Sequence, residues 1–116
     1  MLSNEKIITV PINYGYEYIR ISDIEYIEAD NSYSTIYLND GQKIVISKSL
    51  KYFENALSQF DNFLKVHRSF VINLNYVKSF YKENRGMIVL KSNQTIKLSP
   101  NYTEEYIQKM NERICE

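Results

Sequence analysis

The feature that most constrains the fold is a succession of short runs rich in β-branched and aromatic residues, separated at close intervals by turn residues. Residues 24–29 and 33–38 are two such runs, and Asp30, Asn31 and Ser32 form the polar break between them. Runs of this length and composition favour strands, and their close spacing favours an all-β arrangement. The sequence therefore predicts a mainly β fold with short helices.

The strongest turn signal is Asn39-Asp40-Gly41, because Gly41 supplies at low cost the positive φ that a tight hairpin turn needs. Residues 42–47 are expected to return as the partner strand of this hairpin. A second hairpin is predicted around Asn84-Arg85-Gly86. The remaining strands are predicted at residues 6–12, 16–21, 63–67, 71–72, 77–81, 87–91 and 95–98.

Two short helices are expected among these strands. After the first hairpin the apolar period changes to that of a helix, with a stripe formed by Leu50, Phe53, Leu57 and Phe60. Ser47 or Ser49 is the candidate cap of this helix. The second helix is predicted to begin near residues 99–101, where a capping side chain is followed by Pro100, whose missing N–H suits a first turn.

The formal net charge of zero conceals a gradient along the chain. Residues 1–40 carry two basic and seven acidic side chains (−5), residues 41–97 carry ten basic and three acidic ones (+7), and the remainder contributes −2. Such a distribution suits a protein that presents one face to an anion. It equally suits lysines that simply occupy solvent-facing strand positions, so charge by itself leaves both interpretations open.

Length and composition set the broad class. A chain of 116 residues supports one core, and a single domain over residues 1–116 is expected. No apolar run approaches the roughly 18 residues of a membrane span, and no signal pattern opens the chain. Cys115 is the only cysteine, so no intramolecular disulfide is available. We expect a cytoplasmic protein without membrane contact.

Catalytic groups are difficult to assemble from this sequence. His67 is the only histidine, and although Ser69 follows two residues later, no third group completes a triad. Beyond Glu28 with Asp30 the sequence has no acidic cluster suited to a metal, and the three glycines are too far apart for a phosphate loop. We therefore expect no enzymatic activity, no metal and no cofactor.

The polar side chains suit nucleic-acid binding better. Arg68 lies between the apolar residues Val66 and Phe70, so its flanks are expected to be fixed in the core while the guanidinium projects. Arginine binds guanine bidentately, and asparagine can do the same with adenine. A surface arginine paired with a carboxylate is the alternative for Arg68. A bond to a local turn is the more common role for Asn73, and Asn31 is open to both interpretations.

Five features taken in order resemble one known family. They are Ile24-Glu25-Tyr26-Ile27-Glu28-Ala29-Asp30-x-x-Tyr33, the Asp40-Gly41 hairpin, Ser47-Lys48-Ser49-Leu50 at a helix start, Phe63-x-x-Val66-His67-Arg68-Ser69-Phe70-x-x-Asn73, and Leu98-Ser99-x-x-Tyr102. This order covers nearly the whole chain. It resembles the LytTR family of bacterial DNA-binding domains, and the segment from His67 to Asn73 is the most specific part of the match.

The resemblance implies an elongated antiparallel β-sandwich that binds double-stranded promoter DNA through loops entering successive major grooves. It also implies the output half of a two-component response regulator, joined to a receiver domain, often bound as two copies on a repeated site. The base-contacting positions carried over are Asn31, Ser32, Tyr33, His67, Arg68 and Asn101. The backbone-contacting positions are Lys48, Ser49, Lys51, Ser69, Ser99 and Tyr102. Many members have arginine or lysine where this chain has Pro100 and Asn101.

Two other functions fit parts of the sequence. A β-rich protein–protein interaction module would use the acidic N-terminal segment and Tyr14, Tyr16 or Tyr18, since tyrosine is favoured at interfaces. A single-stranded nucleic-acid binder would stack bases on some of the eleven tyrosines. Dependence of binding on Arg68, and competition between duplex and single strand, separate these functions from duplex recognition.

Overall fold

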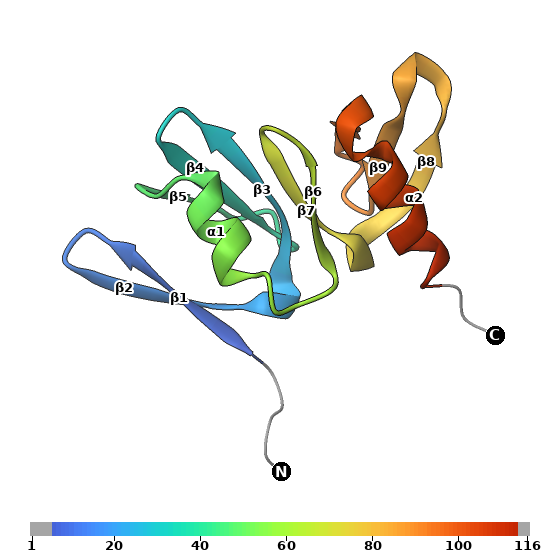
Figure 1. Cartoon of the computed structure of the whole chain (residues 1–116). Helices are drawn as coiled ribbons and strands as arrows, with labels where there is room; N and C mark the ends of the chain where they lie inside the picture. The colour runs from blue at the N-terminus through green and yellow to red at the C-terminus, as the bar shows by residue number, and fades with distance from the viewer. Residues whose placement is uncertain (1–5, 114–116) are drawn as a thin grey trace, which may run out of the picture.

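The computed structural model describes residues 6–113, which form three antiparallel sheets. A two-stranded hairpin, a five-stranded central sheet and a three-stranded sheet follow one another across the molecule (Figure 1). The principal dimensions are 44 × 40 × 24 Å. The mainly β, antiparallel fold class predicted from the sequence is confirmed.

All predicted strands are present, with ends within one residue of their expected positions. The hairpin consists of β1 (Ile7–Ile12) and β2 (Gly15–Arg20). The central sheet consists of β3 (Ile24–Asp30), β4 (Tyr33–Leu38), β5 (Lys43–Ile46), β6 (Phe63–His67) and β7 (Phe70–Asn73). The third sheet consists of β8 (Val77–Tyr81), β9 (Met87–Leu90) and β10 (Thr95–Lys97).

The central sheet has the strand order β5-β4-β3-β7-β6. Two local hairpins, β3–β4 and β6–β7, are joined through the long-range pairing of β3 with β7, in which Tyr26 lies opposite Ile72. The turns of both hairpins, β3–β4 and β6–β7, therefore lie at the same end of the sheet.

Alternate residues of the central sheet face two separate cores, because successive side chains of a strand point to opposite faces. Ile27 and Val71 belong to the first core, which the β1–β2 hairpin and the first helix cover. Tyr26 and Ile72 belong to the second core, which the three-stranded sheet and the last helix cover. Burial on both faces gives the layered, sandwich-like arrangement and holds the ends of the central strands rigidly.

The first helix, α1 (Leu50–Ala56), begins after Ser49, whose side chain accepts a hydrogen bond from the Tyr52 amide. The predicted stripe is longer than the helix: Leu57 and Phe60 lie in turns that follow α1 but still pack in or against the first core. Sequence periodicity extended the helix too far because the turn returns the chain to the same apolar surface.

The last helix forms in two parts. A 3-10 turn, η4 (Pro100–Tyr102), precedes α2 (Thr103–Asn111). The side chain of Ser99 makes no capping bond, contrary to the expected cap. Its carbonyl instead accepts from the Tyr102 amide at 2.9 Å and from the Thr103 hydroxyl at 3.3 Å. Three further 3-10 turns are η1 (Ile21–Asp23), η2 (Leu74–Tyr76) and η3 (Glu83–Arg85). No helix within residues 6–113 is long and apolar enough to cross a membrane.

Candidate nucleic-acid interface

Two turns with predicted contact residues lie side by side at one end of the central sheet. The β3–β4 turn holds Asn31 and Ser32, and the β6–β7 turn holds Arg68 and Ser69. Because Glu28 of β3 pairs with Phe70 of β7, the end of one strand adjoins the start of the other. The Ala29 amide donates a 2.8 Å hydrogen bond to the Ser69 carbonyl and fixes the two turns together.

Two more segments are tied to the same end. The Ser34 hydroxyl donates to the Lys48 carbonyl at 2.8 Å, which fixes the segment between β5 and α1. On the other side, the Ser99 amide donates to the Val66 carbonyl at 2.9 Å and fixes the segment between β10 and η4. Each segment is taken together with the residues that adjoin it: the first residue of β4, the last residue of β6, the first turn of α1, and η4. All the predicted contact residues lie in these four segments. We call this set of segments the loop row.

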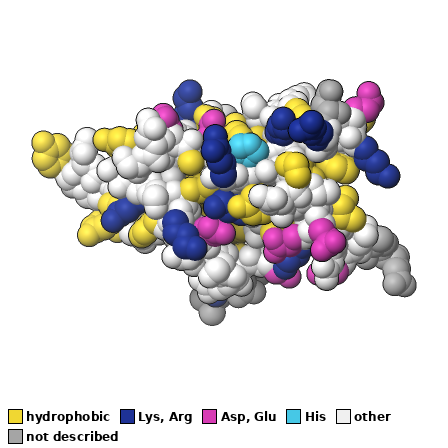
Figure 2. Space-filling view, turned by 45° about the horizontal axis from the view of Figure 1, so that its top comes forward, with side chains coloured by type: hydrophobic (Ala, Val, Ile, Leu, Met, Phe, Trp, Pro, Cys, Tyr) yellow, Lys and Arg dark blue, Asp and Glu magenta, His cyan; other side chains and the backbone are white. Residues whose placement is uncertain are grey.

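The side chains of the loop row differ in exposure. Those that are exposed are Asn31, Ser32, Tyr33, Lys48, Ser49, Lys51, Arg68 and Asn101, and those that are half-buried are His67, Ser69, Ser99 and Tyr102. Figure 2 shows lysine and arginine side chains on both sides of the single histidine. The structure thus gathers cations and hydrogen-bonding groups at one end of the central sheet.

A β-bulge sets the direction of the β6–β7 turn. The pairing of β6 with β7 shifts register between Lys65 and His67, so Val66 has no partner in β7. Val66 is fully buried, and its carbonyl is the acceptor for Ser99. The two residues that follow it, His67 and Arg68, are therefore carried past the end of the sheet from a fixed point.

Arg68 is exposed, and among residues 6–113 it has no carboxylate partner within salt-bridge distance. The alternative of a paired surface arginine is therefore not realised in this structure. The guanidinium is free to hydrogen-bond to a ligand outside the protein.

His67 has a defined tautomer. Its Nδ1 accepts a hydrogen bond from the Ser69 amide at 3.1 Å, so the ring hydrogen is on Nε2. Burial, followed by the nearby charges of Arg68 and Lys97, lowers the pKa of His67 below its ordinary value of 6.5. The ring is therefore neutral near pH 7, and its Nε2–H is a donor.

Asn31 combines a backbone role with an exposed side chain. Its φ is +58°, in the left-handed region that asparagine tolerates better than most residues. The two-residue β3–β4 turn requires this conformation, and the side-chain amide of Asn31 is exposed to solvent. Asn31 is therefore a turn residue whose side chain remains available for contacts, so the two interpretations that the sequence left open are compatible.

Asn73 is a structural residue, as the sequence favoured. It is buried, its oxygen accepts from the Asn62 side chain and the Asn75 amide, and its nitrogen donates to the Ile24 carbonyl at 2.9 Å. These bonds join β7 to the start of β3 at the end of the sheet opposite the loop row. Asn73 therefore fixes the pairing that holds the two turns together.

Two residues of this region were not singled out from the sequence. Lys97 at the end of β10 is exposed and close enough to lower the His67 pKa, and it belongs to the cationic segment that the charge gradient had shown. Tyr52 lies beneath Lys48, whose Nζ is 5.1 Å from the ring centroid. Tyr52 carries no local sequence signal, because the cation–π contact depends on the turn before α1.

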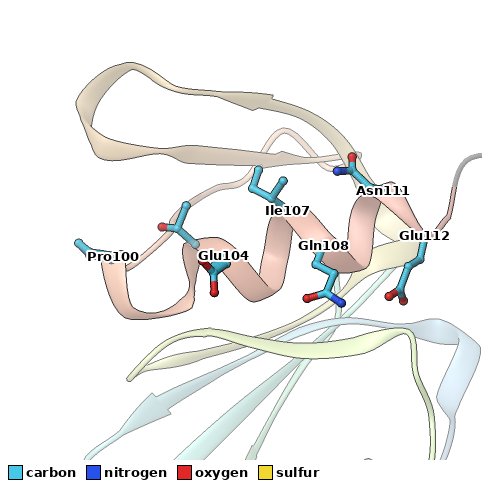
Figure 3. A pocket seen from close by; sticks show the side chains of 7 residues that line it. Pro100, Glu104, Ile107, Gln108, Asn111 and Glu112 are labelled. Atoms are coloured by element: carbon cyan, nitrogen blue, oxygen red, sulfur yellow. The ribbon is translucent and has the colours of Figure 1, made fainter.

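A hollow of about 770 Å³ lies along α2, and Pro100 is the one residue of the loop row that lines it. In Figure 3 the side chains of Ile107 and Asn111 project to the opposite side of the helix from those of Gln108 and Glu112. The polar groups do not converge on one point, as the groups of a catalytic site must. Within residues 6–113 no cluster of three metal-ligating side chains is present.

Comparison with known sequences decides the family. The profile of the LytTr DNA-binding domain matches residues 14–111. The chain belongs to the LytTR family of DNA-binding domains. This LytTR domain has the function class of its family, a DNA-binding domain of transcription regulation, and the resemblance seen in the sequence is confirmed.

Two known proteins are similar to this LytTR domain. One is a solved LytTr DNA-binding domain from a Bacillus cereus protein described as a methyl-accepting/DNA response regulator. The alignment covers 90% of this chain and 95% of the solved one, with a TM-score of 0.76 and 22% sequence identity. This similarity shows a common fold. The CO-responsive transcriptional regulator RcoM of Rhodospirillum rubrum is 33% identical over 84 residues, or 70% of this chain. The aligned part is 35% of the length of RcoM.

Proposed function

We propose that this LytTR domain recognises a specific sequence in duplex promoter DNA through the loop row. The observation that carries the proposal is the hydrogen-bonded joining of four polar segments at one end of the central sheet. Rigid strands buried on both faces support these segments, so the side chains that read bases are positioned before DNA binds.

Within the loop row, Arg68 and His67 have the chemistry for base edges. A free guanidinium suits the O6 and N7 acceptors of guanine, and the Nε2–H of neutral His67 suits a single acceptor in the major groove. Asn31 and Asn101 present exposed amides, which can pair with adenine. We assign base contacts to these four residues and to Ser32 and Tyr33.

The flanking groups suit phosphates. Lys48 and Lys51 supply cations, and Ser49, Ser69, Ser99 and Tyr102 supply hydroxyl or amide donors beside them. Such contacts fix the register of the protein on DNA but carry no sequence information. Ser49 also caps α1, because its hydroxyl oxygen accepts a hydrogen bond from the Tyr52 amide. The hydroxyl that would contact a phosphate is therefore the one that caps the helix.

The dimensions of the domain support contacts in more than one groove. One helical turn of B-DNA is about 34–36 Å, and the two longer dimensions of the domain are 44 and 40 Å. We propose that the β3–β4 turn and the η4 segment enter successive major grooves on one face of the duplex, with the β6–β7 turn between them. Two copies would then occupy a repeated site.

We further propose that the domain is the output part of a cytoplasmic response regulator, controlled by a receiver domain and without catalytic activity of its own. The relative RcoM is a transcriptional regulator, and the region similar to this domain is 35% of its length, which supports a place for the domain within a longer regulator.

Selection of bound duplexes from a random pool tests the proposal. Enrichment of a short motif, repeated at a spacing near whole turns of DNA, is the expected result. The control is competition with single-stranded DNA of the same sequence. The single strand should fail to displace the duplex from the protein. Absence of any enriched motif at low salt would contradict sequence-specific recognition.

A further inference from the structure

A hollow of about 560 Å³ lies between the tip of the β1–β2 hairpin and the loop row. Pro11, Ile12 and Asn13 of the hairpin form one wall, and Tyr33, Ser47 and Lys48 are among the residues of the other. Tyr33 and Lys48 already belong to the proposed DNA contacts. The hollow therefore continues the loop row toward the hairpin.

The groups that line this hollow suit an anion. Lys48 contributes an ammonium group, Ser47 a hydroxyl and Asn13 a side-chain amide, and all three residues are exposed. No carboxylate lines it. A neighbouring hollow is lined by two carboxylates, Glu28 and Asp30, against one cation, Lys43. The charge balance therefore favours a phosphate in the first hollow over the second.

The hairpin wall is held in place by packing. Val10 and Ile19, which alternate with the outward-facing residues of the hairpin, are buried in the first core beside Ile27 and Ile36. The turn at the tip has only two residues, because Ile12 pairs directly with Gly15. Asn13 is consequently presented from a rigid element.

We propose that this hollow binds a backbone phosphate of duplex DNA, beyond the bases that the loop row contacts. Asn13 and Ser47 are the new contact residues, and Lys48 supplies the charge. The proposal rests on the proposed function, because a duplex lying along the loop row carries its sugar–phosphate backbone past the Lys48 side of the row. Donors such as amides and hydroxyls around one lysine are the groups that hold phosphates in protein–DNA complexes.

The test compares the parent protein with the double variant Asn13→Ala/Ser47→Ala on two duplexes. One duplex carries the selected site with long flanks, and the other is trimmed to the bases that the loop row covers. Loss of two hydrogen bonds should weaken binding to the long duplex about five- to thirty-fold and leave binding to the short one unchanged. Both residues are exposed, so thermal unfolding should match that of the parent.

Replacing single flanking phosphates by neutral methylphosphonates identifies the phosphate. Replacement at one phosphate position should weaken DNA binding by the parent protein and have little further effect on binding by the double variant. Tyr18→Ser is the matched control: Tyr18 is exposed on the same hairpin but is absent from the walls of the hollow, and DNA binding should stay unchanged.

Two results would overturn the proposal while leaving the proposed function intact. In the first, the double variant binds the long duplex as well as the parent does, while Arg68→Ala still weakens binding. In the second, Tyr18→Ser weakens binding as much as the double variant, which would make the outer face of the hairpin the contact. Failure of the parent protein to bind any duplex would instead contradict the proposed function.

Discussion

The Nδ1 atom of His67 accepts a hydrogen bond from the backbone amide of Ser69 at 3.1 Å, across the turn that presents Arg68. This bond closes the β6–β7 turn with a side chain and fixes the tautomer of the histidine. The ring of His67 also packs edge-on against Phe70, with centroids 5.6 Å apart. A single imidazole therefore supports the turn, and its Nε2–H is the donor that the proposed function assigns to a base.

The lowered pKa of His67 predicts a loss of stability on acidification. Because its pKa in the folded protein lies below the unfolded value of about 6.5, the unfolded chain binds the proton first as the pH falls. The contribution of neutral His67 to the free energy of unfolding is complete above pH 6.5. It decreases as the pH falls from there toward the folded-state pKa. Urea unfolding at pH 7.5 and pH 5.5 should show this decrease in the parent and a smaller one in His67→Gln. Equal decreases in both proteins would contradict this account.

Replacing Asn73 by alanine should destabilise the fold. The change removes three hydrogen bonds of a buried side chain, those from the Asn62 side chain and the Asn75 amide and that to the Ile24 carbonyl. This should lower the free energy of unfolding by about 2–4 kcal/mol. Chemical denaturation measures the difference. Asn31→Ala, at an exposed turn position, is the control and should cost less. A loss below that of the control would refute a structural role for Asn73.

Replacing Tyr14 by glycine should stabilise the hairpin. Tyr14 has φ +65° and a fully exposed side chain, so the fold carries the strain of a left-handed residue without burial in return. Glycine relieves that strain, and a gain of about 0.5–1 kcal/mol is expected. The melting temperature should rise, whereas Tyr16→Gly, in the adjoining strand, should lower it. A lower melting temperature for Tyr14→Gly would count against this interpretation.

Replacing Tyr52 by leucine should weaken DNA binding without changing the fold. Tyr52 holds the Lys48 ammonium over its ring, and loss of an exposed cation–π contact of about 0.5–1 kcal/mol corresponds to a two- to five-fold weaker affinity. Tyr52→Phe keeps the ring and should bind like the parent. Fluorescence anisotropy with a labelled duplex measures both, and an equal loss in the phenylalanine variant would point to the hydroxyl instead.

Local structure was largely predictable from the sequence. The runs that became β4 and β8 have the predicted bounds, since alternation and turn residues act over a few positions. The length of α1 was predicted wrongly, because Leu57 and Phe60 reach the first core from turns as well as from a helix. Apolar spacing reports which residues are buried and does not fix the backbone that buries them.

The assembly of the site was predictable only through the family resemblance. The segments of Asn31, Arg68 and Ser99 are held at one end of the sheet by the pairing of β3 with β7 and by the Val66 carbonyl, which a bulge leaves unpaired in the sheet. These are long-range contacts with no local sequence signal. Lys97 lay within the positive segment, but its place near His67 follows from the fold.

Base discrimination by Arg68→Ala tests the central claim most directly. Affinity should be measured for the selected site and for its variants at each base pair, with Lys51→Ala as the matched control. Arg68→Ala is expected to lose about 1–3 kcal/mol and to stop discriminating at one base pair, while Lys51→Ala weakens all sites alike and reduces the salt dependence. Retention of full discrimination at every base pair by Arg68→Ala would contradict recognition through the β6–β7 turn.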